Sequence, residues 1–247
     1  MATARFIEPQ ALAPFYPAVL RLALAKAGGG QTQPALQEVG EPSLVKERYR
    51  RMLATGELDV FWSSTTPERE AEFLAVRFNL LKGVNEHRVL VVRRRDLPKF
   101  AAVNGADALR TFKAGAGYHW SDTQILRSNG FQVVTASRHH SLFQMLAHGR
   151  FDFMALSLAE VDDAMHAQAE PELVVEPTLL LRYPQPIYFF VNRQRPELAA
   201  QLLRGLQTAA ADGSFDRLFF ANPSLKQGWE RINDGKRRVL SLHGLQP

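Results

Sequence analysis

Residues 56–70 read GELDVFWSSTTPERE, and this stretch decides the predicted fold. A largely apolar run over residues 58–62 is followed, without a spacer, by four hydroxyl side chains, a proline and an arginine. Val, Phe and Trp favour a buried strand, whereas proline suits the first turn of a helix. A plain surface turn would favour Gly, Asn or Asp. The stretch therefore predicts a buried strand that runs into a helix, with hydroxyls and a guanidinium collected at the junction.

Strands and helices alternate along the rest of the chain. Apolar residues at helical spacing predict helices over residues 14–30, 43–56, 121–130 and 196–213, and apolar runs predict strands over residues 87–94, 131–137, 151–157 and 186–192. Strands separated by helices of about ten residues are typical of βαβ units. The pattern therefore predicts an α/β protein with mostly parallel sheets flanked by helices.

Two segments indicate crossings between domains. RRRDLPK at residues 93–99 is charged, and LRYPQP at residues 181–186 holds two prolines. They bracket a self-contained block of strands and helices. We therefore expect a two-lobe fold in which lobe 1 covers residues 1–93 and 186–247, lobe 2 is the inserted residues 94–185, and two hinge strands join the lobes around a ligand cleft.

Composition excludes several function classes. The 30 Lys and Arg residues are spread along the chain against 25 Asp and Glu residues, and no nucleic-acid recognition motif accompanies them. The chain has no cysteine, which excludes thiolate catalysis, disulfides and cysteine-bound metals. The adjacent His139 and His140 point in different directions and lack a carboxylate at metal-ligand spacing. We expect no metal, no cofactor and no nucleic-acid partner.

Two strand-to-helix junctions carry unusual chemistry. Ligands of open α/β sheets bind beyond the carboxyl ends of the strands. At the first junction, Arg69 offers a planar fork that matches a carboxylate. At the second, KAGAGYHWSDT over residues 113–123, Gly117 allows close backbone approach, and His119 and Trp120 supply a flat face with polar tips. The alternative interpretations are a simple helix cap at the first junction and a simple turn at the second.

The run MLATGELDVFWSSTTPERE, followed by VRFNLLKG and RVLVV, resembles the extracytoplasmic solute-binding proteins of the amino-acid ABC-transporter type. LFQMLAHGRFDFMALSLAEV over residues 142–161 resembles the second-lobe pattern of that family. The resemblance extends from near residue 4 to near residue 222. It implies the type 2 periplasmic-binding fold and the capture of a small carboxylate-bearing solute for delivery to an ABC permease. It also implies a monomer outside the cytoplasm, with a signal peptide removed.

The resemblance assigns roles to residues of both junctions. It implies that hydroxyls after the strand and Arg69 hold the ligand carboxylate, that aromatic rings of lobe 1 sandwich the ligand, and that the glycine junction of lobe 2 closes from the other side. The residues expected in these roles are Tyr16, Trp62, Ser63, Ser64, Thr65, Arg69, Gly117, His119 and Trp120. A tryptophan at a strand end is more often a core residue than a ligand platform, so Trp62 also has a core interpretation. The loop between Asp59 and Arg69 is about two residues shorter than the pattern expects, which leaves open which hydroxyl has which role.

Position 157 departs from the family pattern. Amino-acid binders carry an acid five residues after the aspartate that opens the second-lobe strand, where it pairs with the α-ammonium of the ligand. Counting from Asp152 gives Ser157. A neutral hydroxyl cannot compensate the burial of a full charge. We therefore expect a carboxylate ligand without an α-ammonium; the alternative is that Glu160, one helical turn on, substitutes for the missing acid.

Two other functions remain open at this point. The same scaffold supports enzymes such as cyclohexadienyl dehydratases, for which His119 or Glu160 would have to serve as acid or base. It also supports sensory modules that report a ligand to a signalling partner. We expect a binding protein without catalytic residues.

Overall fold

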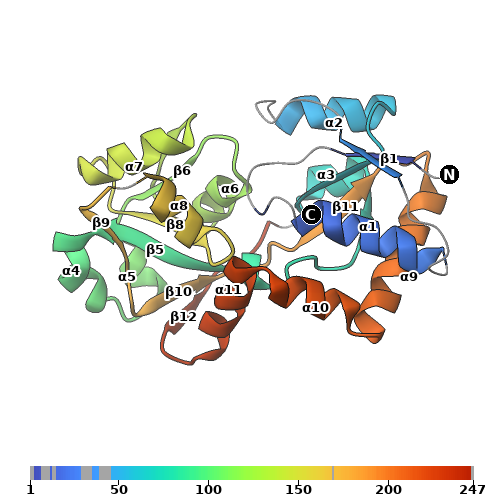
Figure 1. Ribbon diagram of the computed structural model, residues 1–247. Helices are drawn as coiled ribbons and strands as arrows, with labels where there is room; N and C mark the ends of the chain where they lie inside the picture. Colours follow the sequence, from blue (N-terminus) through green and yellow to red (C-terminus); the bar gives the residue numbers. More distant parts are fainter. Residues whose placement is uncertain are drawn as a thin grey trace. The chain divides into compact units, whose positions relative to one another are not determined.

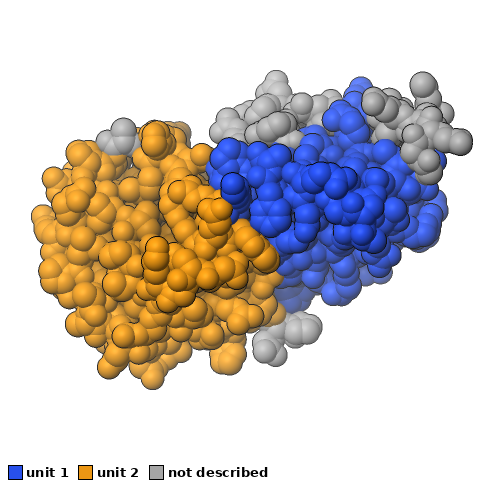
Figure 2. Space-filling model, turned by 60° about the horizontal axis from the view of Figure 1, so that its bottom comes forward, with its two compact units in different colours: residues 1–82, 186–226, 247 blue, residues 83–185, 227–246 orange. Residues whose placement is uncertain are grey.

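The computed structural model of the protein describes residues 3–6, 12, 15–28, 35–38, 46–168 and 170–245. The chain divides into two compact units, shown in different colours in Figure 2. Unit 1 comprises residues 1–82, 186–226 and 247, and unit 2 comprises residues 83–185 and 227–246. Within the described ranges, the chain therefore passes between the units three times.

Unit 1 is built on a three-stranded antiparallel sheet. Its strand order is β3 (Val60–Ser64), β11 (Ile187–Val191) and β4 (Leu74–Val76). A second sheet pairs β1 (Thr3–Phe6) with β2 (Ala35–Glu38) in parallel. The helices assigned to this unit are α1 (Phe15–Ala27), α2 (Lys46–Thr55), α3 (Pro67–Glu72), α9 (Pro196–Ala211) and α10 (Ser214–Ala221).

Helices α1 and α9 of unit 1 lie side by side (Figure 1). Gly205 of α9 makes this approach possible, because a Cβ atom there would lie 1.8 Å from the main-chain oxygen of Ala23 in α1. Leu20 of α1 and Leu206 of α9 are both fully buried. A small residue at a helix crossing thus allows the two backbones to touch.

Unit 2 is built on a seven-stranded mixed sheet. Six strands follow the order β12, β10, β5, β8, β6 and β7, and β9 pairs with β5. Their bounds are β5 His87–Arg93, β6 Ala114–Gly117, β7 Val133–Ala136, β8 Phe153–Ser157, β9 Leu173–Val175, β10 Leu179–Arg182 and β12 Arg238–Ser241. The associated helices are α4 (Leu97–Ala101), α5 (Ala106–Arg110), α6 (Ser121–Ser128), α7 (His139–Ala147), α8 (Val161–Gln168) and α11 (Pro223–Asn233), which spans the boundary at residues 226/227. Short 3-10 turns cover Val84–Glu86 and Arg94–Asp96.

Strand β5 lies in the centre of this sheet (Figure 1). Its four apolar residues, 89–92, are fully buried, as expected for a strand covered on both faces. The side chains of Leu90 and Val92 belong to a core cluster that also holds Ile125 and Leu126 of α6. Helix α6 therefore packs on the same face of the sheet as the even-numbered residues of β5.

The expected α/β class with two lobes is confirmed, but the strand directions and the lobe boundaries differ from the sequence-based prediction. In unit 1 the three-stranded sheet is wholly antiparallel, whereas β1 and β2 pair in parallel. The sheet of unit 2 has three parallel and three antiparallel pairs. Residues 83–93 and 227–246, expected in lobe 1, lie in unit 2, because β5 is its central strand and β12 extends its edge beside β10. The charged segment 93–99 is not a crossing: Arg93 is buried and donates to the main-chain oxygens of Leu146 and Phe151.

Candidate functional site

The junction after β3 in unit 1 forms as the sequence predicts. Strand β3 ends at Ser64 and α3 begins at Pro67. The Thr66 hydroxyl is the N-cap, accepting the main-chain N–H of Arg69 at 3.2 Å. Thr65 donates its main-chain N–H to the Pro186 oxygen at 3.0 Å, which ties the junction to the start of β11.

Arg69 folds back onto the end of β3. Its Nη1 donates to the main-chain oxygen of Ser64, and its guanidinium carbon lies 5.7 Å from the centre of the Phe190 ring. The side chain is half-buried, whereas Ser63 is buried and Ser64 and Thr65 are half-buried. The guanidinium is therefore held at the end of β3, which reduces the entropy that binding a carboxylate would cost.

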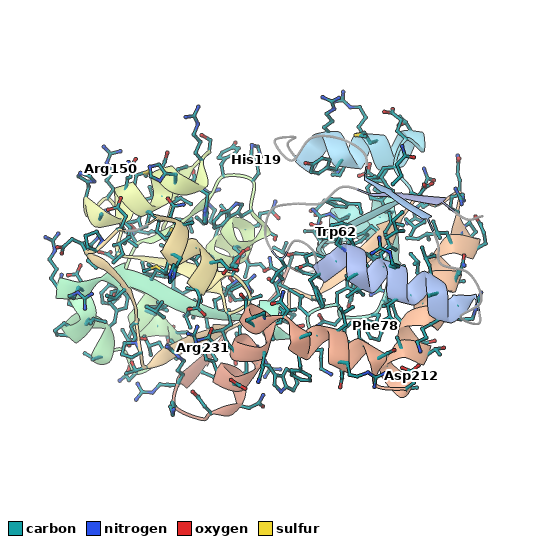
Figure 3. All side chains as sticks on the ribbon, in the orientation of Figure 1. Trp62, Phe78, His119, Arg150, Asp212 and Arg231 are labelled. Carbon is teal, nitrogen blue, oxygen red and sulfur yellow. The ribbon has the colours of Figure 1, made fainter. Side chains whose placement is uncertain are left out.

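The aromatic residues expected to sandwich a ligand pack on each other. The rings of Tyr16 in α1 and Trp62 in β3 are stacked, with centroids 5.2 Å apart and an angle of 24° between planes. Trp62, labelled in Figure 3, also meets the edge of Phe189 at 6.2 Å. Tyr16 is 4% exposed and Trp62 is 3% exposed. The structure thus places both rings in the core of unit 1, directly behind the β3 junction; the sandwich role stays a prediction.

The second candidate site lies at one edge of the unit 2 sheet. The parallel strands β6, β7 and β8 end at this edge, with Gly117, Ala136 and Ser157 as their last residues. Strand β5 is antiparallel to β8, so it begins at the same edge, and Arg88 is the residue opposite Ser157. Because directly opposed residues project from the same face of a sheet, the side chains of Arg88 and Ser157 lie on one side.

The loop from β6 to α6 is shaped by close packing. A Cβ atom on Gly117 would lie 2.3 Å from Nε1 of Trp120, and the main-chain N–H of Trp120 donates to the main-chain oxygen of Gly117 at 3.0 Å. The Trp120 ring centre lies 5.5 Å from that of His139. Tyr118 is 62% exposed, and His119, labelled in Figure 3, is exposed beside it. Gly117 is therefore required for the observed position of the Trp120 ring. The loop also exposes the imidazole of His119 and the phenol of Tyr118 at the surface.

A buried polar cluster lies beneath this loop. Arg88 donates from Nε to Asp122 at 2.9 Å and from Nη2 to the Gln185 side-chain oxygen, and Tyr183 donates its hydroxyl to Asp122 at 2.6 Å. Burial opposes ionisation of Asp122, but the charge of Arg88 and these hydrogen bonds outweigh it and lower the pKa of Asp122. Burial raises the pKa of Tyr183 well above its ordinary value. Among the described residues, Nη1 of Arg88 has no hydrogen-bond partner, so the cluster has a donor for one more acceptor, such as a water oxygen.

Ser157 faces inward and uses its hydroxyl within its own turn. It is 1% exposed, and its oxygen accepts the Ala159 N–H at 3.1 Å. The Glu160 carboxylate accepts the Ser157 N–H at 3.3 Å. Burial opposes the charged form of Arg88, but Asp122, Tyr183 and, to a smaller extent, Glu160 outweigh it and raise the pKa of Arg88. Glu160 also opposes the effect of burial on His139, whose pKa is nonetheless lowered. Glu160 is therefore a half-buried acid beside Ser157. Its substitution for the missing acid stays a prediction.

No protein-family model and no curated protein matches the sequence. Solved structures match over most of the chain. A histidine kinase sensor domain with similarity to periplasmic binding proteins has 16% sequence identity and a TM-score of 0.61. The match covers 87% of this chain and 93% of the sensor domain. An ancestral amino acid-binding protein, a precursor of cyclohexadienyl dehydratase, has 18% identity and a TM-score of 0.61, with 89% and 95% covered. An amino acid ABC transporter substrate-binding protein from Streptococcus pneumoniae, bound to L-arginine, has 13% identity and a TM-score of 0.63, with 92% and 93% covered.

The chain has the type 2 periplasmic-binding fold. Of the expected site residues, the fold brings Tyr16, Trp62, Ser63, Ser64, Thr65 and Arg69 together in unit 1, and it brings Gly117, His119, Trp120 and Ser157 to one sheet edge in unit 2. The two groups belong to different units of this fold.

The prediction from sequence missed three members of the polar cluster, namely Arg88, Tyr183 and Gln185. A weak signal was present in the sequence: Arg88 is a charged residue directly before the apolar run 89–92 of its strand. Its partners are far away in sequence, so no local pattern connects them. Among the described residues, no three His, Asp or Glu side chains gather at a metal-binding distance, and no described helix is long and apolar enough to cross a membrane.

Proposed function

We propose that the chain is a solute-binding protein that captures a small carboxylate-bearing solute outside the cytoplasm and delivers it, as a monomer, to an ABC permease. The observation that carries the proposal is the position of Arg69 within the type 2 periplasmic-binding fold. Its guanidinium is held at the carboxyl end of β3, where Nη1 donates to the main-chain oxygen of Ser64. Proteins of the same fold include binders of amino acids and ABC transporter components.

The chemistry of the β3 junction suits a carboxylate. A guanidinium presents parallel N–H donors that match the two oxygens of a carboxylate. Arg69 uses Nη1 toward Ser64, which orients the fork, and the Phe190 ring beneath it limits its rotamers. Ser63 and Ser64 are the last two residues of β3, and their hydroxyl groups are of a kind that can donate to a carboxylate. The junction therefore supports recognition of an anionic head group.

The chemistry of the unit 2 edge disfavours an α-ammonium at Ser157. The hydroxyl of Ser157 already accepts a hydrogen bond, and the side chain projecting beside it is the guanidinium of Arg88. The charge of Asp122 is neutralised by Arg88. Among the described residues named at this edge, Glu160 is the acid outside that ion pair. We therefore propose that the preferred solute lacks an α-ammonium.

The test begins with mass spectrometry of any small molecule that co-purifies with the protein. A calorimetric screen then compares the twenty amino acids with a panel of organic acids, for the wild type, Arg69→Lys and Arg77→Lys. Arg77 is the matched control because it is exposed and pairs with Glu70 at the surface. We expect organic acids to bind the wild type and the Arg77 variant, and to bind Arg69→Lys at least tenfold more weakly, because a lysine cannot form the fork.

Two outcomes contradict this proposal. If no carboxylate on the panel binds, the proposed function fails. If a standard amino acid binds in the micromolar range, and still binds Glu160→Gln, then the interpretation of Ser157 fails while the carboxylate site stands.

Sensing is the second candidate function, because a histidine kinase sensor domain shares this fold over 87% of the chain. A kinase or cyclase gene next to this one, in place of permease genes, would favour sensing.

Catalysis is the third candidate, favoured by the likeness to a precursor of cyclohexadienyl dehydratase. The His139 and Glu160 side chains are the acid and base that the unit 2 edge offers. Turnover of a cyclic carboxylate by the purified protein, abolished in Glu160→Gln, would establish it.

A further inference from the structure

Gln185 occupies a special place in unit 2. It is the last residue before the chain passes to unit 1 at residues 185/186, and it is 1% exposed. A glutamine is rarely this buried unless its amide is fully hydrogen-bonded. The partners of that amide therefore indicate what the residue does.

Every polar group of the Gln185 side chain is engaged. Its side-chain oxygen accepts a hydrogen bond from Nη2 of Arg88. Its side-chain nitrogen donates to the Ser121 hydroxyl at 2.5 Å and to Oδ2 of Asp122 at 3.3 Å. Ser121 and Asp122 are the first two residues of α6. The side chain of Gln185 is thus bonded directly to the beginning of this helix.

The main chain of Gln185 is bonded to the other crossing. Its main-chain oxygen accepts from Nδ2 of Asn85 at 2.8 Å. Asn85 is 7% exposed and lies two residues after Gly83, where the chain enters unit 2. One residue therefore connects both segments 83–85 and 183–185 with the start of α6.

The connection is stiff for electrostatic reasons. Arg88 and Asp122 form a buried ion pair at 2.9 Å, and Gln185 bonds to both members. Moving one member would leave a buried charge with fewer partners, which costs far more than the bond itself gains. Hydrogen bonds joined in such a network also strengthen each other.

We propose that Gln185 is a positioning residue. It couples the backbone conformation of segments 83–85 and 183–185 to the orientation of the first residues of α6 and of the loop that carries Trp120. The importance of this loop for a ligand rests on the proposed function. The coupling itself does not, because it is a property of the hydrogen bonds within unit 2. A change of backbone conformation at residues 185/186 would reach Ser121 through a single side chain.

Fluorine NMR of protein labelled with 5-fluorotryptophan tests the coupling without any ligand. The chain has three tryptophans, so three resonances are expected, and Trp120→Phe assigns the one from Trp120. The variants are Gln185→Met, which keeps the length of the side chain but removes its polar atoms, and Gln124→Met, an exposed glutamine of α6, as the matched control. We expect Gln185→Met to move or broaden the Trp120 resonance, while the other two resonances and the control spectrum stay unchanged.

A second variant separates coupling from simple loss of packing. Asn85→Ala removes the hydrogen bond to the Gln185 main-chain oxygen and leaves the contacts of Trp120 with Gly117 and His139 intact. We expect it to move the Trp120 resonance as well, and to have no further effect in the Gln185→Met background, since both changes act through one residue. Hydrogen exchange of the amides of residues 120–123 should accelerate roughly five- to tenfold in each single variant, as expected for loss of one buried hydrogen bond.

The proposal is overturned if the Trp120 resonance and the exchange of these amides are unchanged in Asn85→Ala, or if the effects of the two variants add. If Gln185→Met fails to fold, Ser121→Ala takes its place, because it removes only the hydroxyl acceptor at the α6 start. An unchanged Trp120 signal in Ser121→Ala would equally overturn the proposal. A protein that passes this test and binds no carboxylate would refute the proposed function alone.

Discussion

Replacing Arg69 with alanine should separate the stability of unit 1 from its binding chemistry. In the structure, the side chain makes one charge-assisted hydrogen bond to the Ser64 oxygen and lies 5.7 Å from the centre of the Phe190 ring. The hydrogen bond is worth roughly 1.5 kcal/mol, and the cation–π contact is worth about 0.5 kcal/mol at a partly exposed site. Arg69→Ala should therefore lower the free energy of unfolding by about 2 kcal/mol.

The expected loss of binding is larger. A carboxylate that loses its paired guanidinium loses about 2–4 kcal/mol, which is a factor of roughly 30–1000 in Kd. A loss of 2 kcal/mol in stability corresponds to a fall of about 4–8 °C in Tm for a chain of this size. The folded variant should thus remain in large excess at 25 °C, so that weak binding cannot be attributed to unfolding.

The assay pairs thermal melting with calorimetry of the organic acid that binds the wild type most tightly. Arg77→Ala is the control, because it removes an exposed arginine and one surface ion pair with Glu70. Normal binding by Arg69→Ala would refute the carboxylate assignment. A melting temperature equal to that of the wild type would refute the structural contacts assigned to the side chain.

Three further predictions concern packing and charge. Gly205→Ala should lower the free energy of unfolding by about 1–3 kcal/mol despite the better helix propensity of alanine, because its Cβ would overlap the Ala23 oxygen; an unchanged melting temperature would contradict the close crossing of α1 and α9. Gly117→Ala should displace the Trp120 ring and shift its fluorescence toward that of an exposed indole while the protein stays folded. An unshifted spectrum would contradict the close packing of the Trp120 ring on Gly117. The pKa of Asp122 is lowered in the folded state, so its contribution is present above its ordinary pKa near 3.9 and is lost as the pH falls through the lower, folded value. Urea unfolding between pH 2 and 6 should therefore show a steeper loss of stability for the wild type than for Asp122→Asn, and parallel curves would contradict the depressed pKa.

The sequence by itself determined the local structure at the β3 junction. Thr66, Pro67 and Arg69 are near neighbours in the chain, and N-cap and first-turn preferences act over three or four residues. The junction therefore forms as its residue types dictate. The class of fold was equally accessible, because alternation of apolar strands with helices is a local pattern repeated along the chain.

Tertiary structure alone decided the direction of the strands and the polar cluster of unit 2. Strand β11 lies antiparallel between β3 and β4, and β5 lies in the middle of the unit 2 sheet. Backbone groups can form ladders in parallel or antiparallel pairs, so the sequence of a strand does not fix its direction. The direction depends on the connections between the strands. The partners of Arg88 are 34 and 97 residues away along the chain. No local preference connects residues at that separation, since their interaction energy appears only after the sheet and α6 have packed and excluded water from the charges.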